Sequence, residues 1–442
     1  MELFITIFET PFIVLGFVAM IGLIIQKKTA GQVFSGTIKT ALGLIMVSTG
    51  AGILVGYILP FVGMFPVVFN LEGFATSSEG VVAAMSGAVP MVARNFGIIM
   101  AIGFLVNILL ARFTPLKYVF LTGHMMWILS ITVAFVCYNA GFNDIMTIVV
   151  GSLIQGVIMV ILPALTQPMV RKTIGSDDFG IAHLTTLGTV PAGYIGGLLG
   201  NKKYDAEDFK LPESLEFFKD TACAITIVMG IFYFILILAA GPVIVAEYSG
   251  GGNYIIYALT QTLGFVVGVL VLLQGVRMFL GELVPAFKGI SDKLVPGDIP
   301  ALDVPALFSY MPNSLMIGFV TAVVGMIVAM LASSFVFGTV PLVSIIGAFF
   351  TGGVAGIFGN ANGGRRGAMI AGFIYGFLLI FCTAGLSKLY DFAAFGSAGL
   401  GHDCLDAMGV LAAFKWPIVG FVIIAVAFAF LWIAEVNYKK KK

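Results

Sequence analysis

The stretch QGVRMFLGELVPAFKGISDKLVPGDIPALDVPALFSYMPN, residues 274–313, concentrates charge in the middle of a chain that is otherwise strongly apolar. Prolines interrupt it repeatedly, so it does not read as one continuous helix. Ionisable side chains are expensive inside a membrane and mark functional segments there. The charged positions of this stretch are Arg277, Glu282, Lys288, Asp292, Lys293, Asp298 and Asp303.

The composition places the chain among polytopic helical membrane proteins. Of its 442 residues, 60% are hydrophobic and only 10% are charged, and the mean hydropathy is +1.08. These values lie far outside the range of soluble proteins. The net charge of +1 gives no reason to expect a nucleic-acid partner. The four scattered cysteines match neither a disulfide framework nor a metal site.

Apolar runs along the chain predict about eleven transmembrane helices, since each span needs about 20 apolar residues. The charge-free run 304–364 is expected to contain two spans and one element that enters the membrane without crossing it. The shorter run 181–200, interrupted by glycine and proline, predicts a second re-entrant element. The N-terminal segment lacks the features of a cleaved signal peptide and is expected to be the first anchor.

Basic residues predict the orientation. Lys27 and Lys28 after the first apolar run and the terminal lysines 439–442 place that loop and the C-terminus in the cytoplasm, and the N-terminus outside. The segment 201–220 mixes lysines with acids and is expected to be a solvated cytoplasmic loop. We expect a similar cytoplasmic turn at GNANGGRRG, residues 359–367.

The sequence contains a weak internal repeat. The segments 49–60 and 274–285 superpose at an offset of 225 residues, which pairs Gly50 with Gly275, Gly56 with Gly281 and Pro60 with Pro285. Spaced glycines of this kind allow helices to approach closely in lipid. A single transmembrane unit would then divide into a first repeat of about 1–200, the loop 201–220 and a second repeat of about 221–442. Inverted repeats place a substrate site between the halves, and a chance match of glycine-rich helices is the alternative.

A few ionisable residues fall within or beside the apolar runs and are candidates for a site. Several of them also have a purely structural interpretation. In that interpretation the histidines make structural hydrogen bonds, Asp303 caps a half-helix, and Arg277 pairs with Glu282 along its own helix. The histidine spacing makes a metal site unlikely, and the chain has no Walker A motif. The candidates are Glu79, His124, His183, Arg277, Glu282 and Asp303, and His402 is expected to be structural.

Several motifs resemble one known family. They include SGTIKTALG (35–43), LTGH (121–124), GIAH (180–183) and LGNKKYDAEDFKLPESL (199–215). The stretch quoted first belongs with them, through QGVRMF and PALD. Together these segments resemble the ascorbate-type membrane component, EIIC, of the bacterial phosphoenolpyruvate-dependent sugar phosphotransferase system.

This resemblance implies a homodimer in the bacterial inner membrane, with a core domain that holds the sugar and a scaffold domain that dimerises. It implies no cofactor. The phosphoryl group would arrive on a cysteine of a separate cytoplasmic protein, EIIB, which receives it through EIIA, HPr and enzyme I. Whether the chain itself counts as an enzyme is therefore left open.

The family's substrate contacts fall on His124, His183 and Asp303 and on the Ser78–Glu79 stretch, with His183 or Asp303 as the possible base. This sequence departs from the family pattern after both histidines, where glutamines are expected and apolar residues such as Leu184 stand instead. Ascorbate or a related polyhydroxylated carbohydrate is the substrate that the resemblance implies. An ion-coupled secondary transporter of a small polar solute is the alternative function.

Overall fold

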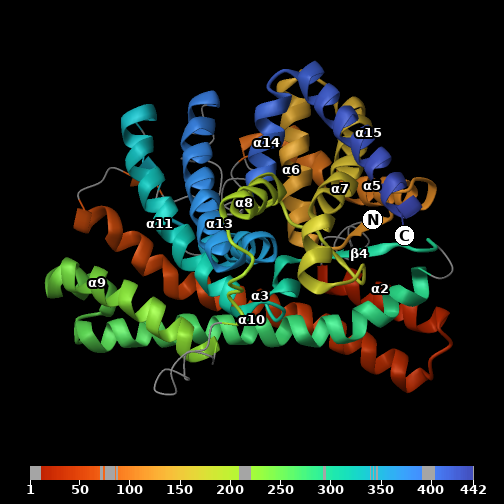
Figure 1. Cartoon of the computed structure of the whole chain (residues 1–442). Helices are drawn as coiled ribbons and strands as arrows, with labels where there is room; N and C mark the ends of the chain where they lie inside the picture. The colour runs from red at the N-terminus through yellow and green to blue at the C-terminus, as the bar shows by residue number, and fades with distance from the viewer. Residues whose placement is uncertain are drawn as a thin grey trace.

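The structure is a computed structural model, and helices dominate it (Figure 1). It describes residues 11–69, 73–74, 85, 88–208, 221–291, 295–338, 340–341, 343–344, 347–390 and 404–441. Among these residues, seven helices are long and apolar enough to cross a membrane. The chain is therefore a mostly helical, multi-pass membrane protein, as its composition predicts. The expected number of about eleven spans stays a prediction.

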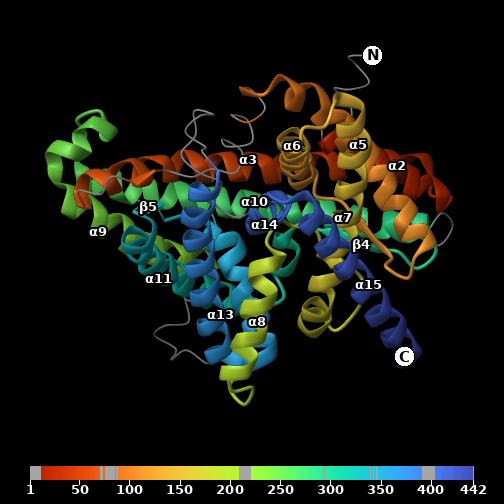
Figure 2. The same cartoon turned by 90° about the horizontal axis from the view of Figure 1, so that it is seen from above.

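Four helices form a layer along one side of the molecule (Figure 1). They are α2 (Pro11–Ile25), α3 (Ala30–Phe69), α9 (Thr221–Ser249) and α10 (Tyr254–Ser291). Both views show α3 and α10 side by side along most of their length (Figures 1 and 2). At Gly264 a Cβ atom would overlap the ring of Tyr57, so this glycine allows the close contact. Lys39 of α3 binds Glu282 of α10 at 2.9 Å.

The remaining helices stand on this layer (Figure 1). Within this group α5 packs against α7, α11 along α13, and α13 against α8. The helices are α5 (Pro90–Phe113), α6 (Gly123–Asn139), α7 (Asp144–Ile174), α8 (Thr186–Leu199), α11 (Pro312–Phe337), α13 (Gly353–Leu389), α14 (Leu405–Phe414) and α15 (Pro417–Lys441).

The helix α13 is a hairpin of two helical arms. The backbone leaves the helical conformation at Gly363 and at Gly364, where φ is 63° and ψ is −167°. A left-handed φ of this kind favours glycine. Beyond the turn the chain folds back, so that a Cβ at Gly359 would overlap the carbonyl oxygen of Gly367. The GNANGGRRG segment is thus a turn, as expected, and it joins two packed helical arms.

Two small parallel sheets join segments far apart in the sequence, and the sequence did not predict them. The strands β1 (Gly73–Phe74) and β5 (Val340–Pro341) form one pair. The second sheet has the order β2-β4-β3. Its strands are β2 (Tyr118–Phe120), β4 (Ile299–Leu302) and β3 (Gly180–Ile181), and both pairings are parallel.

Two of the expected membrane elements have more structure than the sequence predicts. The run 304–364 contains the 3₁₀ turn η2 (Val304–Leu307), α11, a π-helical turn η3 (Ala348–Gly352) and the first arm of α13. The run 181–200 contains the end of β3 and the 14-residue helix α8, which is shorter than a membrane span. Entry of these segments into the membrane stays a prediction.

The first part of the segment 201–220 is partly exposed as expected, at residues 201–204 and 208, but it also contacts the helical body. Its cytoplasmic location stays a prediction. Residues 201–208 bind the helical body, because the carboxylate of Glu207 accepts hydrogen bonds from the backbone N–H groups of Asn313 (3.2 Å) and Ser314 (2.8 Å) at the start of α11. Asp205 accepts a further bond from Asn360 at 2.7 Å. These acids therefore satisfy helix-start and side-chain donors, a use that composition does not reveal. Residues 209–220 lie outside the described part of the chain.

Candidate functional site

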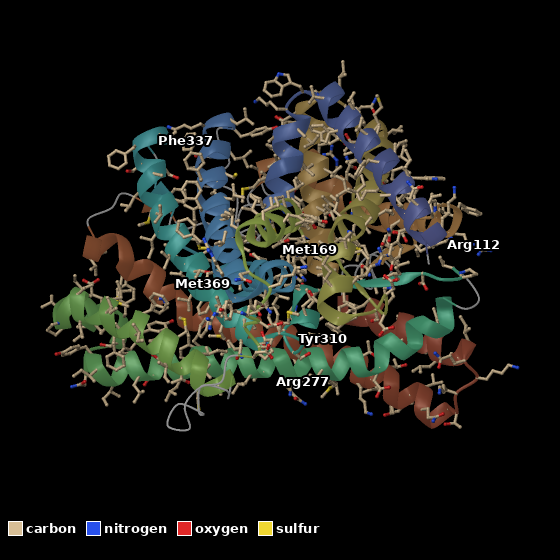
Figure 3. All side chains as sticks on the ribbon, in the orientation of Figure 1. Arg112, Met169, Arg277, Tyr310, Phe337 and Met369 are labelled. Atoms are coloured by element: carbon tan, nitrogen blue, oxygen red, sulfur yellow. The ribbon has the colours of Figure 1, made fainter. Side chains whose placement is uncertain are left out.

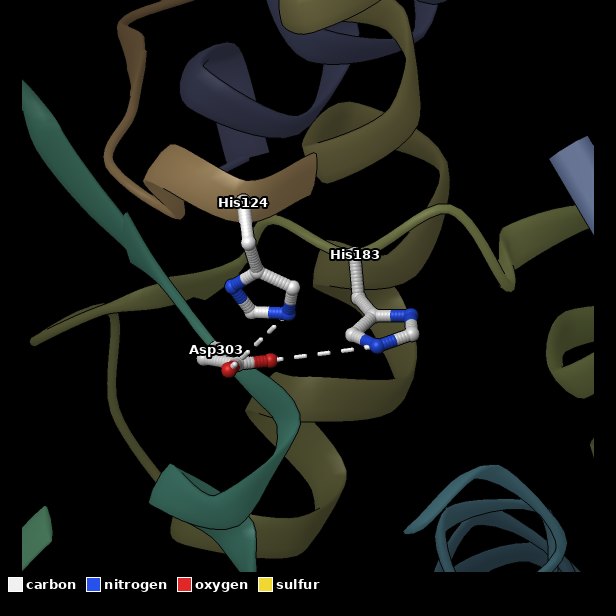
Figure 4. Close-up of side chains that lie close together, drawn as sticks. All are labelled: His124, His183 and Asp303. Carbon is white, nitrogen blue, oxygen red and sulfur yellow. Dashed lines mark ion pairs between the residues drawn. The ribbon is translucent and has the colours of Figure 1, made fainter. Parts of the chain in front are cut away.

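The three-stranded sheet brings the predicted histidines and aspartate together. His124 lies in the first turn of α6, shortly after β2. His183 follows β3, and Asp303 directly follows β4. The strands are parallel, so their carboxyl ends meet at one edge of the sheet. The three side chains converge there (Figure 4).

The Asp303 carboxylate lies between the two imidazoles. Its Oδ2 is 3.9 Å from Nε2 of His124, and its Oδ1 is 3.9 Å from Nε2 of His183. The two imidazole rings lie edge to face, with centroids 6.3 Å apart. Both nitrogen–oxygen distances of 3.9 Å are longer than a hydrogen bond. A ligand hydroxyl placed among the three groups would therefore bring its own donor and acceptor into reach of each of them.

Exposure differs sharply across the cluster. The His124 side chain is 45% exposed, that of Asp303 is 15% exposed, and that of His183 is 2% exposed. The cluster therefore has an open side at His124 and a closed side at His183. A solute would reach His124 first, and its innermost polar group would contact His183.

Burial also shifts the protonation of the two inner groups, which lie outside the spanning helices. It lowers the pKa of His183 well below its usual value, and the nearby His124 adds to this shift. Burial raises the pKa of Asp303, although the bond from the Val304 N–H and the charge of His124 oppose the rise. The raised pKa makes Asp303 a better proton acceptor for a hydroxyl group, whereas the lowered pKa weakens His183 as a base and keeps its imidazole neutral.

Asp303 also caps a helix, as one alternative from the sequence predicts. Its Oδ1 accepts a hydrogen bond from the N–H of Val304 at 2.7 Å, at the start of η2. The cap does not compete with the site, because a carboxylate accepts several hydrogen bonds at once. It fixes the rotamer and turns the other oxygen toward His124.

The same three residues form a geometry that a metal ion can use. One ligand atom from each of His124, His183 and Asp303 lies within 4.8 Å of the others. Two imidazole nitrogens and a carboxylate are common ligands of divalent transition metals. The sequence spacing concealed this grouping, because the three residues follow separate strands that are far apart in the sequence.

Buried amides hold two of the strands in place, and the sequence interpretation missed them. The Asn107 side chain of α5 donates to the Tyr118 carbonyl (3.0 Å) and accepts from the Phe120 N–H (2.9 Å), so it binds β2 on both sides of its central residue. Gln167 of α7 donates to the Phe179 carbonyl at 3.3 Å, just before β3. A polar amide inside an otherwise apolar run was the available signal.

The other predicted residues do not join this cluster in the described part of the chain. Ser78, Glu79 and His402 lie outside the described residues. Arg277 is exposed on α10 and points away from the body of the molecule (Figure 3). The suggested pairing of Arg277 with Glu282 is wrong, because Glu282 binds Lys39 of the neighbouring helix instead.

Comparison with known proteins identifies the family of the chain. The model of the EIIC-GAT family, described as the PTS system sugar-specific permease component, matches residues 6–407. The chain belongs to this permease family. The match spans nearly the whole chain and includes all three residues of the cluster, so the phosphotransferase resemblance is confirmed at the family level.

A curated relative of this permease is the ascorbate-specific PTS system EIIC component of Mycoplasma pneumoniae. The two are 28% identical over 458 aligned positions, which cover 90% of this chain and 69% of the relative. Two apolar residues flank the histidines of the present permease: Ile128, one turn after His124 in α6, and Leu184, directly after His183. Both are buried.

Proposed function

We propose that this permease is an EIIC component that carries ascorbate or a related polyhydroxylated carbohydrate, and that His124, His183 and Asp303 bind it. The observation that carries the proposal is the convergence of these three side chains at one edge of the β2-β4-β3 sheet. Fixed donors and acceptors in an otherwise apolar surrounding are what a sugar site needs. Ser78 and Glu79 are proposed as further contacts from the family resemblance.

The chemistry needs a base and a phosphoryl donor. In the proposed reaction, a sugar hydroxyl attacks the phosphorus of phosphocysteine on EIIB, the S–P bond breaks, and the thiolate of EIIB leaves. His183 or Asp303 takes the hydroxyl proton as the new O–P bond forms. EIIA, HPr and enzyme I would supply EIIB with further phosphoryl groups. The membrane chain contributes the sugar site and the base.

The architecture of the proposed carrier is a homodimer in the bacterial inner membrane, with the N-terminus outside and the C-terminus in the cytoplasm. We propose that each chain has about eleven spans in two inverted repeats. The element order supports the repeat. Adding 225 to α5 (Pro90–Phe113) gives 315–338, which nearly coincides with α11 at Pro312–Phe337. The same offset pairs α3 with α10, and each small sheet joins strands from both halves.

One experiment distinguishes the proposed phosphotransferase function from the alternative, an ion-coupled transporter. Right-side-out vesicles containing the protein are loaded with phosphoenolpyruvate, enzyme I, HPr, EIIA and EIIB and receive labelled ascorbate outside. The proposal expects phosphorylated ascorbate inside, with or without ionophores that collapse the proton and sodium gradients. Omission of EIIB is the control and should abolish the product. Uptake of unmodified solute that stops when the ion gradients collapse would reject the proposal.

A further inference from the structure

A buried carboxylate from the C-terminal part of the chain binds the segment that carries His183. Asp406, in the first turn of α14, is 1% exposed. Its Oδ2 accepts a hydrogen bond from the N–H of Thr186 (2.8 Å), and its Oδ1 accepts one from the N–H of Leu187 (2.6 Å). Its own N–H donates to the carbonyl of Leu184 at 2.9 Å. Three hydrogen bonds thus join one residue of α14 to three of the four residues that follow His183.

These bonds replace the N-terminal cap that the residue before α8, Thr185, does not provide. A helix start leaves its first N–H groups without partners inside the helix, and a nearby Ser, Thr, Asp or Asn side chain usually accepts from them. Thr185 occupies that position in α8 but makes no such bond. Its hydroxyl instead binds the hydroxyl of Tyr375 at 2.7 Å. Asp406 therefore performs, from another helix, the task of the missing cap.

The same turn of α14 also contacts the other histidine segment. The Sγ atom of Cys404 lies 3.8 Å from the Sδ atom of Met125, the residue next to His124. Both side chains are buried. The helix α14 packs against α6 and against α8, and Figure 1 shows it beside α6. One short turn therefore touches the chain beside each of the two histidines.

The fit between α8 and α14 leaves little room for movement. A Cβ atom at Gly188, in the first turn of α8, would meet the ring of Tyr375 at 2.6 Å and the side chain of Leu405 at 2.7 Å. The start of α8 is thus held sterically by α13 and α14 and electrostatically by Asp406. His183 lies only three residues before Thr186, so its position depends on this junction.

We propose that Asp406 is a positioning residue of the candidate site, which fixes the start of α8 and thereby holds His183 opposite Asp303 and His124. The inference rests on the proposed function only in taking this cluster as the substrate site. The placement of His183 itself is testable without any substrate.

The test uses diethyl pyrocarbonate on the purified full-length protein, with modification of each histidine followed by peptide mass spectrometry. In the wild type, exposed His124 should react and buried His183 should be protected. The Asp406→Asn variant keeps the size of the side chain but loses one of the two acceptors. Modification of His183 should accelerate about tenfold, which corresponds to about 1.4 kcal/mol. The rate at His124 is the internal reference.

Tyr390→Phe is the matched control. The Tyr390 hydroxyl donates to the Leu411 carbonyl at 2.8 Å, near the other end of α14. Its removal deletes one buried hydrogen bond of α14 without touching α8, so His183 should stay protected even if the melting temperature falls. Unchanged protection of His183 in Asp406→Asn would overturn the proposal. Equal loss of protection in both variants would also overturn it, because it would show general loosening.

Hydrogen exchange on the wild type provides a second test if Asp406→Asn does not fold. The amides of Thr186 and Leu187 should exchange as slowly as those in the middle of α8, and fast exchange at both would overturn the proposal. The outcomes separate the two proposals. Failure of ascorbate phosphorylation in the wild type concerns the function alone, whereas the protection of His183 concerns the role of Asp406 alone.

Discussion

Oδ1 of Asp303 lies 3.9 Å from Nε2 of His183, and the two residues are joined by the pairing of β4 with β3. Backbone hydrogen bonds of the sheet therefore hold the chain before His183, with Ala182 N–H donating to the Leu302 carbonyl at 2.7 Å, while Asp406 holds the chain after it. A site built on paired strands changes little when one side chain is replaced. Substitutions at His183 and Asp303 should consequently report on ligand contacts and leave the fold intact.

His183→Ala and Asp303→Asn are expected to weaken ascorbate binding strongly while the protein still inserts into the membrane. Each change removes a partner from a buried polar ligand, which costs about 1–3 kcal/mol or roughly 5- to 150-fold in affinity. The rise in melting temperature at a fixed ascorbate concentration should shrink accordingly, because only a bound ligand produces it. Asp144→Asn, at an exposed acid of α7, is the control. Wild-type affinity in both site variants would contradict the assignment.

Leu184→Gln is expected to increase the preference for ascorbate over pentitols. The family resemblance places an amide after this histidine, and a site that hydrogen-bonds its substrate discriminates strongly against analogues. Leu184 is fully buried, so the new amide should also lower the melting temperature of the free protein, since a buried polar group without a partner is costly. The measurement is the thermal shift with each ligand. An unchanged ratio between ascorbate and pentitols would contradict this role for the position.

An ionic network near the C-terminus predicts a large stability effect. Arg171 of α7 pairs with Asp177 and lies 3.4 Å from Glu435 of α15. It also stacks on the ring of Tyr438, with its guanidinium carbon 3.8 Å from the centroid. Arg171→Met leaves two partly buried carboxylates without this partner and should lower stability by about 3–5 kcal/mol.

The matched control for this network is Arg94→Met. Arg94 pairs with Asp144 at 3.1 Å, but the two side chains are 60% and 47% exposed. Exposed pairs contribute little, so the melting temperature should hardly change. Both variants are measured by thermal unfolding in the same detergent. Equal melting temperatures for Arg171→Met and Arg94→Met would show that the network near Glu435 contributes no more than a surface pair.

The sequence predicted the class of the fold and named the residues of the candidate site, for physical reasons that are specific to membrane proteins. A charged residue in an apolar run is rare and costly, so His124, His183 and Asp303 could be named without a structure. Their convergence followed from the family resemblance and not from spacing. Short strands of two to four residues have no periodicity to detect, so the sheet that assembles the site was missed.

Other features depend on contacts that a sequence does not display. Asp406 stands beside an apolar run, but it accepts hydrogen bonds from donors in another helix. One of these donors, the N–H of Thr186, lies 220 residues earlier in the sequence. The prediction that the repeat glycines allow close helix packing is also wrong for two of them. A Cβ at Gly56 or Gly281 would meet nothing within 4 Å, so close helix packing does not explain these two positions. It does explain Gly264, which the repeat pattern did not select.

Replacing glycine with alanine is therefore expected to destabilise the protein at Gly364 and to stabilise it at Gly281. Gly364 has a φ of 63°, and a Cβ there would overlap the carbonyl oxygens of Asn201 and Tyr204. Gly364→Ala should prevent closure of the α13 hairpin on residues 201–204, since the backbone conformation of Gly364, with ψ of −167°, is adopted almost only by glycine and costs other residues about 1–3 kcal/mol. Little monodisperse protein should be recovered. Gly281→Ala meets open space inside α10 and should stabilise the protein by about 0.5–1 kcal/mol, because alanine favours helix. Size-exclusion yield and melting temperature check both, and a folded Gly364→Ala protein with wild-type stability would contradict the strained turn.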